Sequence, residues 1–341
     1  MRVTVGRARP SGLPPWRRLV VLAVVPAVVL VTAGVLAWIR FDGGGPQYRR
    51  GPVTVFTGGT GGIYYRYGTA LSASINGSLP GVRATTMITG AAVDNLRRVA
   101  AEPNTFGFST MDAATAAVRG QDPFKKAALP VRAVARIYDE YIHLIVPRDS
   151  PVRTLADLRG RRVSTGAPGS GTDLVATRLF TVDPAIDLAD VTQRRLGVDE
   201  SAKALADGTI DAFFWQGGLP TITVADLASR FPVWFVPLDG LVGRLDDVQE
   251  WGAEYRRGVI PDGAYAGVGA TPTVAMADLL VTSVDTDPGL VREVTRILFD
   301  ARETIARVVP VAYSLDPRSA VATGPVPLHE GAARYYRATK V

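Results

Sequence analysis

The 341-residue chain contains no cysteine and only two histidines, and these shortages exclude several kinds of site. A chain without cysteine has no disulfide, no thiolate nucleophile, no cysteine-bound zinc and no lipid attached through an N-terminal cysteine. His143 and His329 lie far apart in the sequence and lack the spacing of metal ligands, and no cluster of Asp and Glu takes their place. The sequence therefore predicts a protein without a bound metal ion or cofactor.

Residues 51–341 also lack an excess of positive charge. Of the 38 basic and 32 acidic side chains, eight arginines and one acid (Asp42) lie in residues 1–50, which leaves 30 basic and 31 acidic side chains in residues 51–341. Nucleic-acid binding depends on a basic surface that neutralises phosphates. We therefore expect no nucleic-acid partner, in spite of the net charge of +6.

Residues 19–39 form a run of 21 residues without a charged side chain. As a helix this run would be about 31 Å long, close to the ~30 Å hydrocarbon core of a bilayer. Five arginines and no acid precede it, so the positive-inside rule places residues 1–18 in the cytoplasm and the rest of the chain outside. We expect a single-pass signal anchor at 19–39 and a Gly/Pro linker at 40–51, which hold an extracytoplasmic binding domain at the cell membrane. A cleaved signal peptide is the alternative, although the run exceeds the ~7–15 residues of a normal signal-peptide core and residues 35–37 are a poor cleavage sequence.

From residue 52 onward, short β-type runs alternate with helical stretches, which predicts an α/β fold. The expected strands are 53–56, 82–87, 106–109, 131–138, 141–146, 162–165, 191–196 and 212–215. The expected helices are 63–76, 90–100, 112–119, 155–158, 199–206 and 288–308, with others beginning at 172, 220 and 330. The polar, proline-rich segment 147–152 predicts a crossing between two lobes, and the apolar stretch 273–281 predicts a return to the first. Lobe one would comprise residues 52–146 and 273–341, and lobe two residues 147–272.

Four glycine loops follow predicted strands and precede predicted helices. They are 57–62 (TGGTGG), 89–90 (TG), 167–172 (APGSGT) and 216–218 (QGG). Glycine lets the backbone approach a ligand closely, and the free N–H groups at the start of a helix favour an anion. Any one of these loops alone is typical of a tight turn with a cap. Four of them, at the strand ends where α/β proteins bind ligands, indicate a binding site.

The loops lack the residues of phosphate-binding and nucleophile motifs. Thr172 stands where a phosphate loop requires lysine, and Ser170 lies in P-G-S-G-T rather than G-x-S-x-G. We therefore expect no enzyme, but a protein that binds a small carboxylate without transforming it. The aromatic residues Tyr64, Tyr65 and Trp215 beside the loops fit either the core or the pocket.

Five segments between residues 53 and 336 follow one another in the order VTVFTGGTGGIYYRYGTALS, ITGAAVDNLRRV, LADLRGRRVSTGAPGSGT, IDAFFWQGGLPT and PLHEGAARYY. Together they resemble the TAXI family, the extracytoplasmic solute receptors associated with TRAP transporters. The resemblance implies a two-lobe, periplasmic-binding-protein-like fold with two hinge strands. It also implies capture of a small carboxylate, such as a glutamate-like amino acid or a dicarboxylate, for the membrane permease subunits of a TRAP-type secondary transporter.

The same resemblance assigns the ligand contacts residue by residue. They are Thr60, Gly61, Tyr64 and Gly90 in lobe one, and Ser170, Gly171, Thr172, Trp215 and Gly217 in lobe two. Ser170 and Thr172 would hold a carboxylate at the start of a helix, and the alternative is that one of them only caps that helix. Ala91 stands where the family has glycine, which narrows this loop.

No arginine lies within the glycine loops. The nearest arginines in the sequence, and the candidates for a charged contact, are Arg66, Arg83, Arg97, Arg136 and Arg178. We expect His143, in an apolar run, to be a core residue and His329 to cap the C-terminal helix.

Two functions remain open for a receptor of this kind. We favour delivery to a transporter, with closure at hinges near Pro147 and residues 271–273, because each lobe carries only half of the donors. The alternative is a ligand-binding sensor module that signals to a membrane histidine kinase, because an anchored receptor cannot carry its ligand far.

Overall fold

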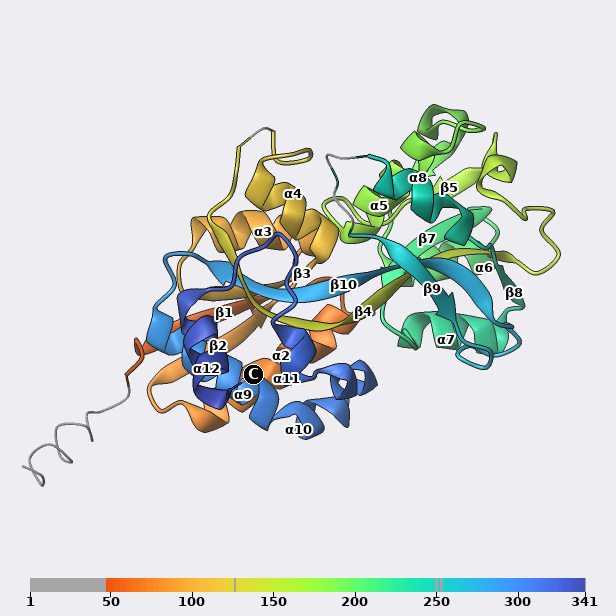
Figure 1. Ribbon diagram of the computed structural model, residues 1–341. Helices are drawn as coiled ribbons and strands as arrows, with labels where there is room; N and C mark the ends of the chain where they lie inside the picture. The colour runs from red at the N-terminus through yellow and green to blue at the C-terminus, as the bar shows by residue number, and fades with distance from the viewer. Residues whose placement is uncertain (1–46, 126, 249–250, 252–253, 341) are drawn as a thin grey trace, which may run out of the picture. The chain divides into compact units, whose positions relative to one another are not determined.

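The computed structural model describes residues 47–125, 127–248, 251 and 254–340 (Figure 1). The predicted cytoplasmic segment and signal anchor, and the linker up to residue 46, lie outside these residues and stay predictions. Among the described residues, no helix has both the length and the apolar composition that a membrane span requires.

The ten described strands form one mixed β-sheet, which confirms the predicted α/β class. Eight of them follow the order β2-β1-β3-β10-β4-β7-β5-β6, while β8 pairs with β4 and β9 with β10. The strands are β1 (Gly51–Phe56), β2 (Val82–Met87), β3 (Thr105–Thr110), β4 (Val131–Pro147), β5 (Arg162–Ser164), β6 (Thr192–Arg194), β7 (Ala212–Gly217), β8 (Val233–Phe235), β9 (Arg256–Ile260) and β10 (Thr271–Ser283).

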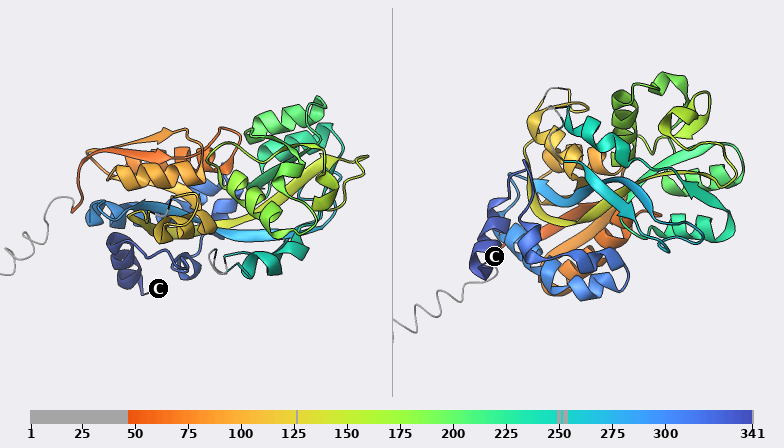
Figure 2. Two further views of the ribbon diagram at one scale, coloured as in Figure 1. Left: turned by 90° about the horizontal axis from the view of Figure 1, so that it is seen from above. Right: turned by 45° about the vertical axis from the view of Figure 1, so that its right-hand side comes forward.

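Helices cover both faces of this sheet (Figure 2). The α-helices are α2 (Ile63–Ser78), α3 (Ala92–Ala101), α4 (Met111–Arg119), α5 (Gly171–Val182), α6 (Val198–Ala206), α7 (Ile222–Arg230), α8 (Val242–Asp246), α9 (Pro288–Asp300), α10 (Arg302–Ala306), α11 (Pro317–Ala320) and α12 (Glu330–Thr339). The 3₁₀ helices are η1 (Leu155–Leu158), η2 (Leu188–Asp190), η3 (Asp239–Leu241) and η4 (Pro310–Ser314). The predicted helix 288–308 is thus divided between α9 and α10.

Strand β4 is the longest element of the sheet and pairs with different strands along its length. Residues 131–141 pair with β10, and residues 141–145 pair with β7, so the partner changes at Tyr141. Strand β10 also changes partners along its length: residues 275–283 pair with β4, residues 278–282 pair with β3, and residues 271–275 pair with β9. These two strands run from one group of helices and strands into the other (Figure 1).

The prediction of two separate strands at 131–138 and 141–146 was wrong, because β4 is one strand of 17 residues. The polar pair Asp139-Glu140 does not end the strand, since both side chains have partners. Asp139 accepts a hydrogen bond from the Arg136 guanidinium at 2.7 Å, and Glu140 accepts one from the Tyr138 hydroxyl at 3.0 Å. Alternation places these two carboxyls on opposite faces of the strand.

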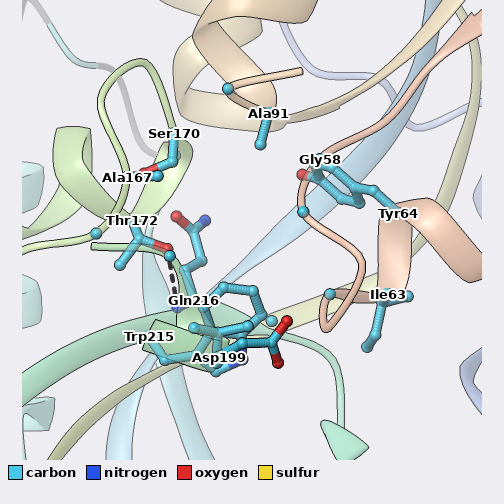
Figure 3. A pocket seen from close by; sticks show the side chains of 18 of the residues that line it. Gly58, Ile63, Tyr64, Ala91, Ala167, Ser170, Thr172, Asp199, Trp215 and Gln216 are labelled. Carbon is cyan, nitrogen blue, oxygen red and sulfur yellow. Dashed lines mark hydrogen bonds between the residues drawn. The ribbon is translucent and has the colours of Figure 1, made fainter. Parts of the chain in front are cut away.

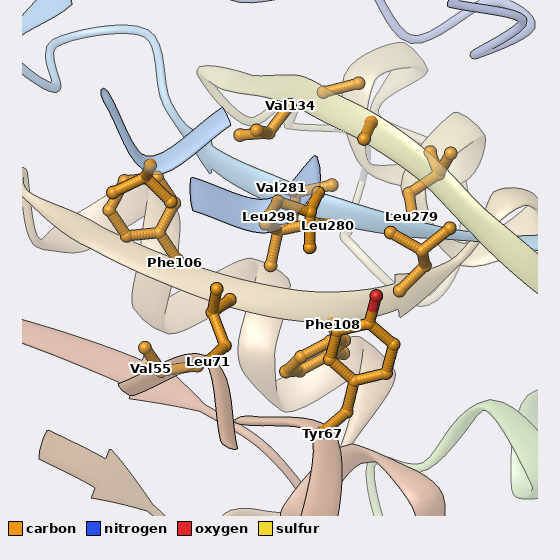
Figure 4. Close-up of a cluster of buried hydrophobic side chains, with 14 of the residues drawn as sticks. Val55, Tyr67, Leu71, Phe106, Phe108, Val134, Leu279, Leu280, Val281 and Leu298 are labelled. Atoms are coloured by element: carbon orange, nitrogen blue, oxygen red, sulfur yellow. The ribbon is translucent and has the colours of Figure 1, made fainter. Parts of the chain in front are cut away.

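The apolar side chains form separate buried clusters in the two parts of the sheet. One cluster packs α2, α3 and α9 against β1, β3 and the first part of β4, and includes Tyr67, Phe108 and Leu280 (Figure 4). In the second part, neighbouring residues of β7 face different clusters: Phe214 packs toward α5 and Phe213 toward α6 and α7. Burial of each such side chain contributes roughly 1.5–3 kcal/mol to folding.

We use lobe one and lobe two for the parts that hold these clusters, with the boundaries predicted from the sequence. Those boundaries, at 146/147 and 272/273, stay predictions, because β4 and β10 pass across both without a break.

The structure confirms both expectations for histidine. His143 is fully buried, and its Nε2 lies 3.0 Å from the Tyr265 hydroxyl. Burial lowers the pKa of His143 to about 4. His329 is the N-cap of α12, where its Nδ1 accepts a hydrogen bond from the Gly331 N–H at 3.1 Å.

Candidate functional site

A cleft of about 380 Å³ lies where the four glycine loops meet (Figure 3). Each of the predicted loops, which are far apart in the sequence, supplies part of its wall. The lining residues of lobe one are 58–60, 62–64, 88–91, Thr110 and Glu140. Those of lobe two are 166–167, 170–172, 196–200 and 215–217.

Eight of the nine predicted contact residues line this cleft. They are Thr60, Tyr64, Gly90, Ser170, Gly171, Thr172, Trp215 and Gly217. Gly61 is not among the lining residues. A Cβ at Gly61 would lie 2.0 Å from Oδ1 of Asp199, so glycine there lets the first loop pass close to α6 of lobe two. Ligand binding by these residues stays a prediction.

The two lobes touch on both sides of the cleft. On one side, the carbonyl of Gly169 in lobe two accepts hydrogen bonds from the N–H groups of Val93 and Asp94 at the start of α3, at 3.0 and 3.2 Å. On the other side, the Thr223 hydroxyl of α7 lies 3.4 Å from the carbonyl of Gly61, while it donates its hydrogen to Asp199 at 2.7 Å. The loops thus enclose the cleft between two interlobe contacts.

The start of α5 carries the two hydroxyls that the sequence analysis singled out. Ser170 is the N-cap, and its Oγ accepts from the Asp173 N–H at 3.0 Å. Thr172 Oγ1 accepts from the Gln216 N–H at 3.2 Å, which ties the helix to β7. The capping alternative is therefore present for Ser170. Each hydroxyl still has its own hydrogen to donate, because both bonds use the oxygen as acceptor.

A second helix begins at the opposite wall. Helix α2 starts at Ile63, and its N-cap, Gly62, offers no side-chain acceptor to the first N–H groups. Those groups have no carbonyl one turn earlier in the helix. The starts of α2 and α5 therefore both face the cleft with polar N–H groups, an arrangement that suits an anion.

Aromatic residues close the apolar part of the cleft. Tyr64 lines it and also belongs to the core, where its ring stacks on Phe108 with centroids 5.3 Å apart. Trp215 lines it, and its indole N–H donates to the Thr221 hydroxyl at 2.8 Å. Tyr65 is not among the lining residues. The sequence analysis treated core and pocket as alternatives for Tyr64, but in the structure this side chain belongs to both.

Ala91 adopts a backbone conformation that normally requires glycine. Its φ is 76° and its ψ is −145°, and it is the N-cap of α3. The resemblance to a family with glycine at this position fits that geometry, because L side chains are strained at positive φ. The methyl group of Ala91 lies on the cleft wall (Figure 3).

None of the described residues that line the cleft is a lysine or an arginine. The five arginines considered from the sequence lie elsewhere. Arg178, for example, is buried in a contact with Asp112 and Tyr255. The ionisable side chains that do line the cleft, apart from Tyr64, are carboxyls: Glu140, Asp199 and Glu200.

Glu140 belongs to a buried polar cluster beneath the cleft. The Tyr138 hydroxyl donates to Glu140 Oε1 at 3.0 Å, and the Tyr64 hydroxyl donates to Asp278 Oδ1 at 2.9 Å. Burial raises the pKa of Glu140 to about 8, although the hydrogen bond from Tyr138 acts against the shift. Burial, and next the negative charge of Glu140, raise the pKa of Asp278 well above its ordinary value.

The sequence analysis did not single out Glu140, Asp278, Gln216 or Asp199. A signal existed for the first two, because each interrupts a long apolar run of a strand that must be buried. Gln216 begins the predicted glycine loop 216–218, although it was not assigned as a ligand contact. For Asp199 we find no local signal, since acidic residues are common in the first turn of a helix.

Comparisons with known proteins show the family to which the chain belongs. A sequence profile of the NMT1-like family matches residues 55–338. The chain belongs to the NMT1-like family. Among solved structures, the periplasmic binding protein BugD is similar, with a TM-score of 0.50 and 14% identity over 86% of this chain and 98% of that chain. This NMT1-like chain thus has the α/β fold of periplasmic binding proteins, as predicted.

Two further structures are similar at lower scores. One is the periplasmic aliphatic sulphonate binding protein SsuA from Escherichia coli, with a TM-score of 0.43 and 15% identity over 85% of this chain and 91% of that one. The other is R. palustris Rpa4515 with adipate, with a TM-score of 0.48 and 18% identity over 85% and 95% of the two chains. The narrower assignment of this NMT1-like chain to the TAXI receptors stays a prediction.

Proposed function

We propose that this NMT1-like chain is an extracytoplasmic solute receptor that captures a small carboxylate for a TRAP-type secondary transporter. The observation that carries the proposal is the cleft itself, in which glycine loops from both lobes bring two helix starts to one cavity. Such loops let a ligand approach the backbone closely and offer N–H donors to an anion. The periplasmic-binding-protein fold agrees with this function, and the resemblance to the TAXI family supplies the TRAP partner.

The donors of the cleft suit a carboxylate that is held without formal positive charge. At the start of α5, the hydroxyls of Ser170 and Thr172 can each donate one hydrogen bond, and the first N–H groups of the helix can add to them. Hydrogen bonds to a charged acceptor contribute about 1.5–3 kcal/mol each. Three such bonds would contribute about 4.5–9 kcal/mol, so a micromolar dissociation constant, which corresponds to about 8.2 kcal/mol after the entropic cost of binding, requires further contacts from the rest of the cleft.

Closure of the lobes agrees with the contacts across the cleft. The hydrogen bonds to Gly169 and the contact of Thr223 with Gly61 form only when the lobes approach, because the groups that they join lie in different lobes. A ligand that contacts both lobes would add to these bonds and shift the population toward the closed form. Release to a permease would then require that they break.

The alternative is a sensor module for a membrane histidine kinase. The feature that favours it is the signal anchor predicted at residues 19–39, because a tethered receptor stays near its membrane partner. Genomic neighbours distinguish the two roles: genes for TRAP membrane subunits beside this one support transport, and a gene for a histidine kinase supports sensing.

Native mass spectrometry of the full chain, extracted in mild detergent, tests the receptor proposal. We expect a bound carboxylate of low mass to be retained from the host cell, and to be recovered intact after incubation. Recovery of a chemically altered product would contradict a receptor that only binds. Retention of a solute without a carboxyl group would contradict the ligand class.

A further inference from the structure

Two buried side-chain oxygens at and below the cleft, one of Gln216 and one of Asp278, have no hydrogen-bond partner among the described residues. Gln216 is 4% exposed, lines the cleft, and has no hydrogen-bond partner for its Oε1 among the described residues. Its amide nitrogen faces the Met276 sulfur at 2.9 Å, and a thioether can only accept, so the oxygen is the atom left for a ligand. Asp278 is fully buried, and its Oδ2 is likewise without a partner. A buried acceptor without a donor is costly, so these two oxygens favour a ligand group that donates hydrogen bonds.

These acceptors share one face of three neighbouring strands. Glu140 on β4 is paired in register with Met276 on β10, and Tyr138 is paired with Asp278. Because side chains alternate along a strand, all four lie on the same face, with Glu140 and Asp278 as diagonal neighbours. On the other side of β4, Gln216 of β7 is paired with Ile142 and continues the same face. Figure 3 shows the Gln216 amide extending into the cleft from this face.

The ionisable side chains that line the cleft, apart from Tyr64, are all carboxyls, so each of them is either negative or neutral. Asp199 and Glu200 of α6 lie on its lobe-two wall, and Glu140 lies on its lobe-one side. Asp199 accepts from the Thr223 hydroxyl at 2.7 Å and Glu200 from the Gly197 N–H at 3.1 Å. A dicarboxylate would bring a second negative charge into this surrounding, and the described lining offers no cation to balance it.

We propose that Glu140, with Asp278 behind it, binds a positively charged nitrogen of the solute, and that the pair releases a proton when the solute enters. This inference rests on the proposed function, since the carboxylate of the same solute would lie at the start of α5. It assigns the ligand to the zwitterions, the amino-acid-like carboxylates, and predicts weaker binding of a plain dicarboxylate.

The number of protons released on binding depends on how many protons Glu140 and Asp278 hold when the cleft contains no solute. In the empty cleft at neutral pH the two carboxyls hold at least one proton, because burial raises the pKa of Glu140 to about 8 and raises that of Asp278 as well. An ammonium group beside them stabilises the ionised form. The protonated carboxyl then loses its proton to solvent, no bond of the solute is broken, and the solute nitrogen keeps its own hydrogens. By linkage, affinity rises with pH below about pH 8, by up to tenfold per unit for one released proton.

The other ionisable groups around the pair are tyrosines, carboxyls and a histidine. Helix α2 contributes Tyr64 and Tyr67, and β4 contributes Tyr138, all with pKa values raised above 10 by burial. Helix α4 contributes the Asp112 carboxyl, which forms an ion pair with Arg178. Helix α6 contributes the carboxyls of Asp199 and Glu200, which are exposed. His143, further along β4, has a pKa lowered to about 4. The three tyrosines and His143 thus have pKa values outside the range from pH 6 to 8, and the variant Glu140→Gln tests the assignment of the proton to the pair.

Three compounds with one five-carbon frame test the inference: L-glutamate, 2-oxoglutarate and glutarate differ only in an ammonium, a ketone or a methylene at C2. L-Leucine and its 2-oxo acid form a second, monocarboxylate set. Each would be titrated calorimetrically into the full chain in mild detergent at pH 6, 7 and 8, once in phosphate and once in imidazole buffer. The two buffers differ in ionisation enthalpy, so the difference in measured heat reports the number of protons released. We expect an amine-bearing member to bind at least about tenfold more tightly than its 2-oxo partner, and to release close to one proton at pH 6 and fewer at pH 8.

Two variants test whether the proton release and the preference for an amine depend on Glu140. Glu140→Gln should abolish the proton release and most of the preference for the amine. Asp139→Asn, which removes the neighbouring carboxyl on the opposite face of β4, is the matched control and should leave both unchanged. Should Glu140→Gln fail to fold, the wild-type comparison still decides, because it needs no variant.

Two outcomes would overturn the inference in different ways. Tight binding of 2-oxoglutarate or glutarate without proton release would refute the cation site and leave the receptor function standing. Absence of binding by every member of both sets would refute the carboxylate receptor and this inference with it.

Discussion

The buried ion pair between Asp112 and Arg178 allows a quantitative test of the structure. Asp112 lies in α4 of lobe one and Arg178 in α5 of lobe two, and their side chains are 0% and 4% exposed. The Asp112 carboxylate accepts from the Arg178 guanidinium at 3.2 Å, from the Tyr255 hydroxyl at 2.7 Å and from the Ala113 N–H at 2.7 Å. Replacement of Asp112 by asparagine keeps the shape and removes the charge.

The expected cost of this replacement is about 3–5 kcal/mol in the free energy of unfolding. The loss comes mainly from Arg178, which would keep its charge in a buried site without a carboxylate. The control is Asp207→Asn, which breaks the pair between Lys203 and Asp207, whose side chains are 76% and 49% exposed. That replacement should cost no more than about 1 kcal/mol, because water screens an exposed pair.

Urea unfolding of the full chain, followed by tryptophan fluorescence, measures both variants. For a protein of this size the loss for Asp112→Asn corresponds to a melting temperature lowered by roughly 10 °C. The double variant Asp112→Leu, Arg178→Met should recover most of it, because a buried pair can be replaced by apolar groups at little cost. A loss below about 1 kcal/mol for Asp112→Asn, or equal losses for both pairs, would refute the burial of this contact.

Further predictions concern the cleft and the movement of the lobes. Ala91→Gly should raise the free energy of unfolding by about 1 kcal/mol in a urea titration, because it relieves the positive φ of alanine, and a decrease would show that the strain is absent. Ser170→Ala should lower it by about 1 kcal/mol through loss of the α5 cap, and unchanged affinity for L-glutamate in this variant would assign Ser170 to capping alone. Between pH 7 and 8 the folded chain keeps the proton of Glu140 while the unfolded chain has lost it, so stability should fall with rising pH by up to about 1.4 kcal/mol per unit. Glu140→Gln should flatten that slope in melts across this interval, and an unaltered slope would assign it to another group. Small-angle scattering should show a smaller radius of gyration with a saturating zwitterion than without one, and equal values would contradict hinge closure.

The glycine loops show why part of the site was predictable. A strand end, a glycine and a helix start form a local pattern, and the tendency of glycine to allow close backbone approach depends only on its missing Cβ. Parallel strands bring such ends to one edge of a sheet, so loops that are far apart in the sequence meet there. Eight of the nine residues assigned by resemblance line the cleft for this reason. Gly61 does not, because α6 of lobe two occupies the space beside it.

The length of β4 shows where local patterns mislead. Asp139-Glu140 between two apolar runs predicted a break, because charged residues are uncommon inside strands. In the structure, Arg136 and Arg256 hold Asp139 on one face, while Tyr138 holds Glu140 on the other. Arg256 is more than a hundred residues away in the sequence, so its contribution could not be predicted from the neighbourhood of Asp139.

By itself, the sequence determined the α/β class, the positions of most strands and helices, the glycine loops and the balance of basic and acidic side chains in residues 51–341. Each of these depends on composition or on residues close together in the chain. Only the tertiary structure decided the polar character of the cleft. Glu140, Asp278 and Gln216 come from β4, β10 and β7, and they share a face because these strands are neighbours in the sheet. Burial then changes their ionisation and leaves acceptors without donors, and burial is a property of the whole fold.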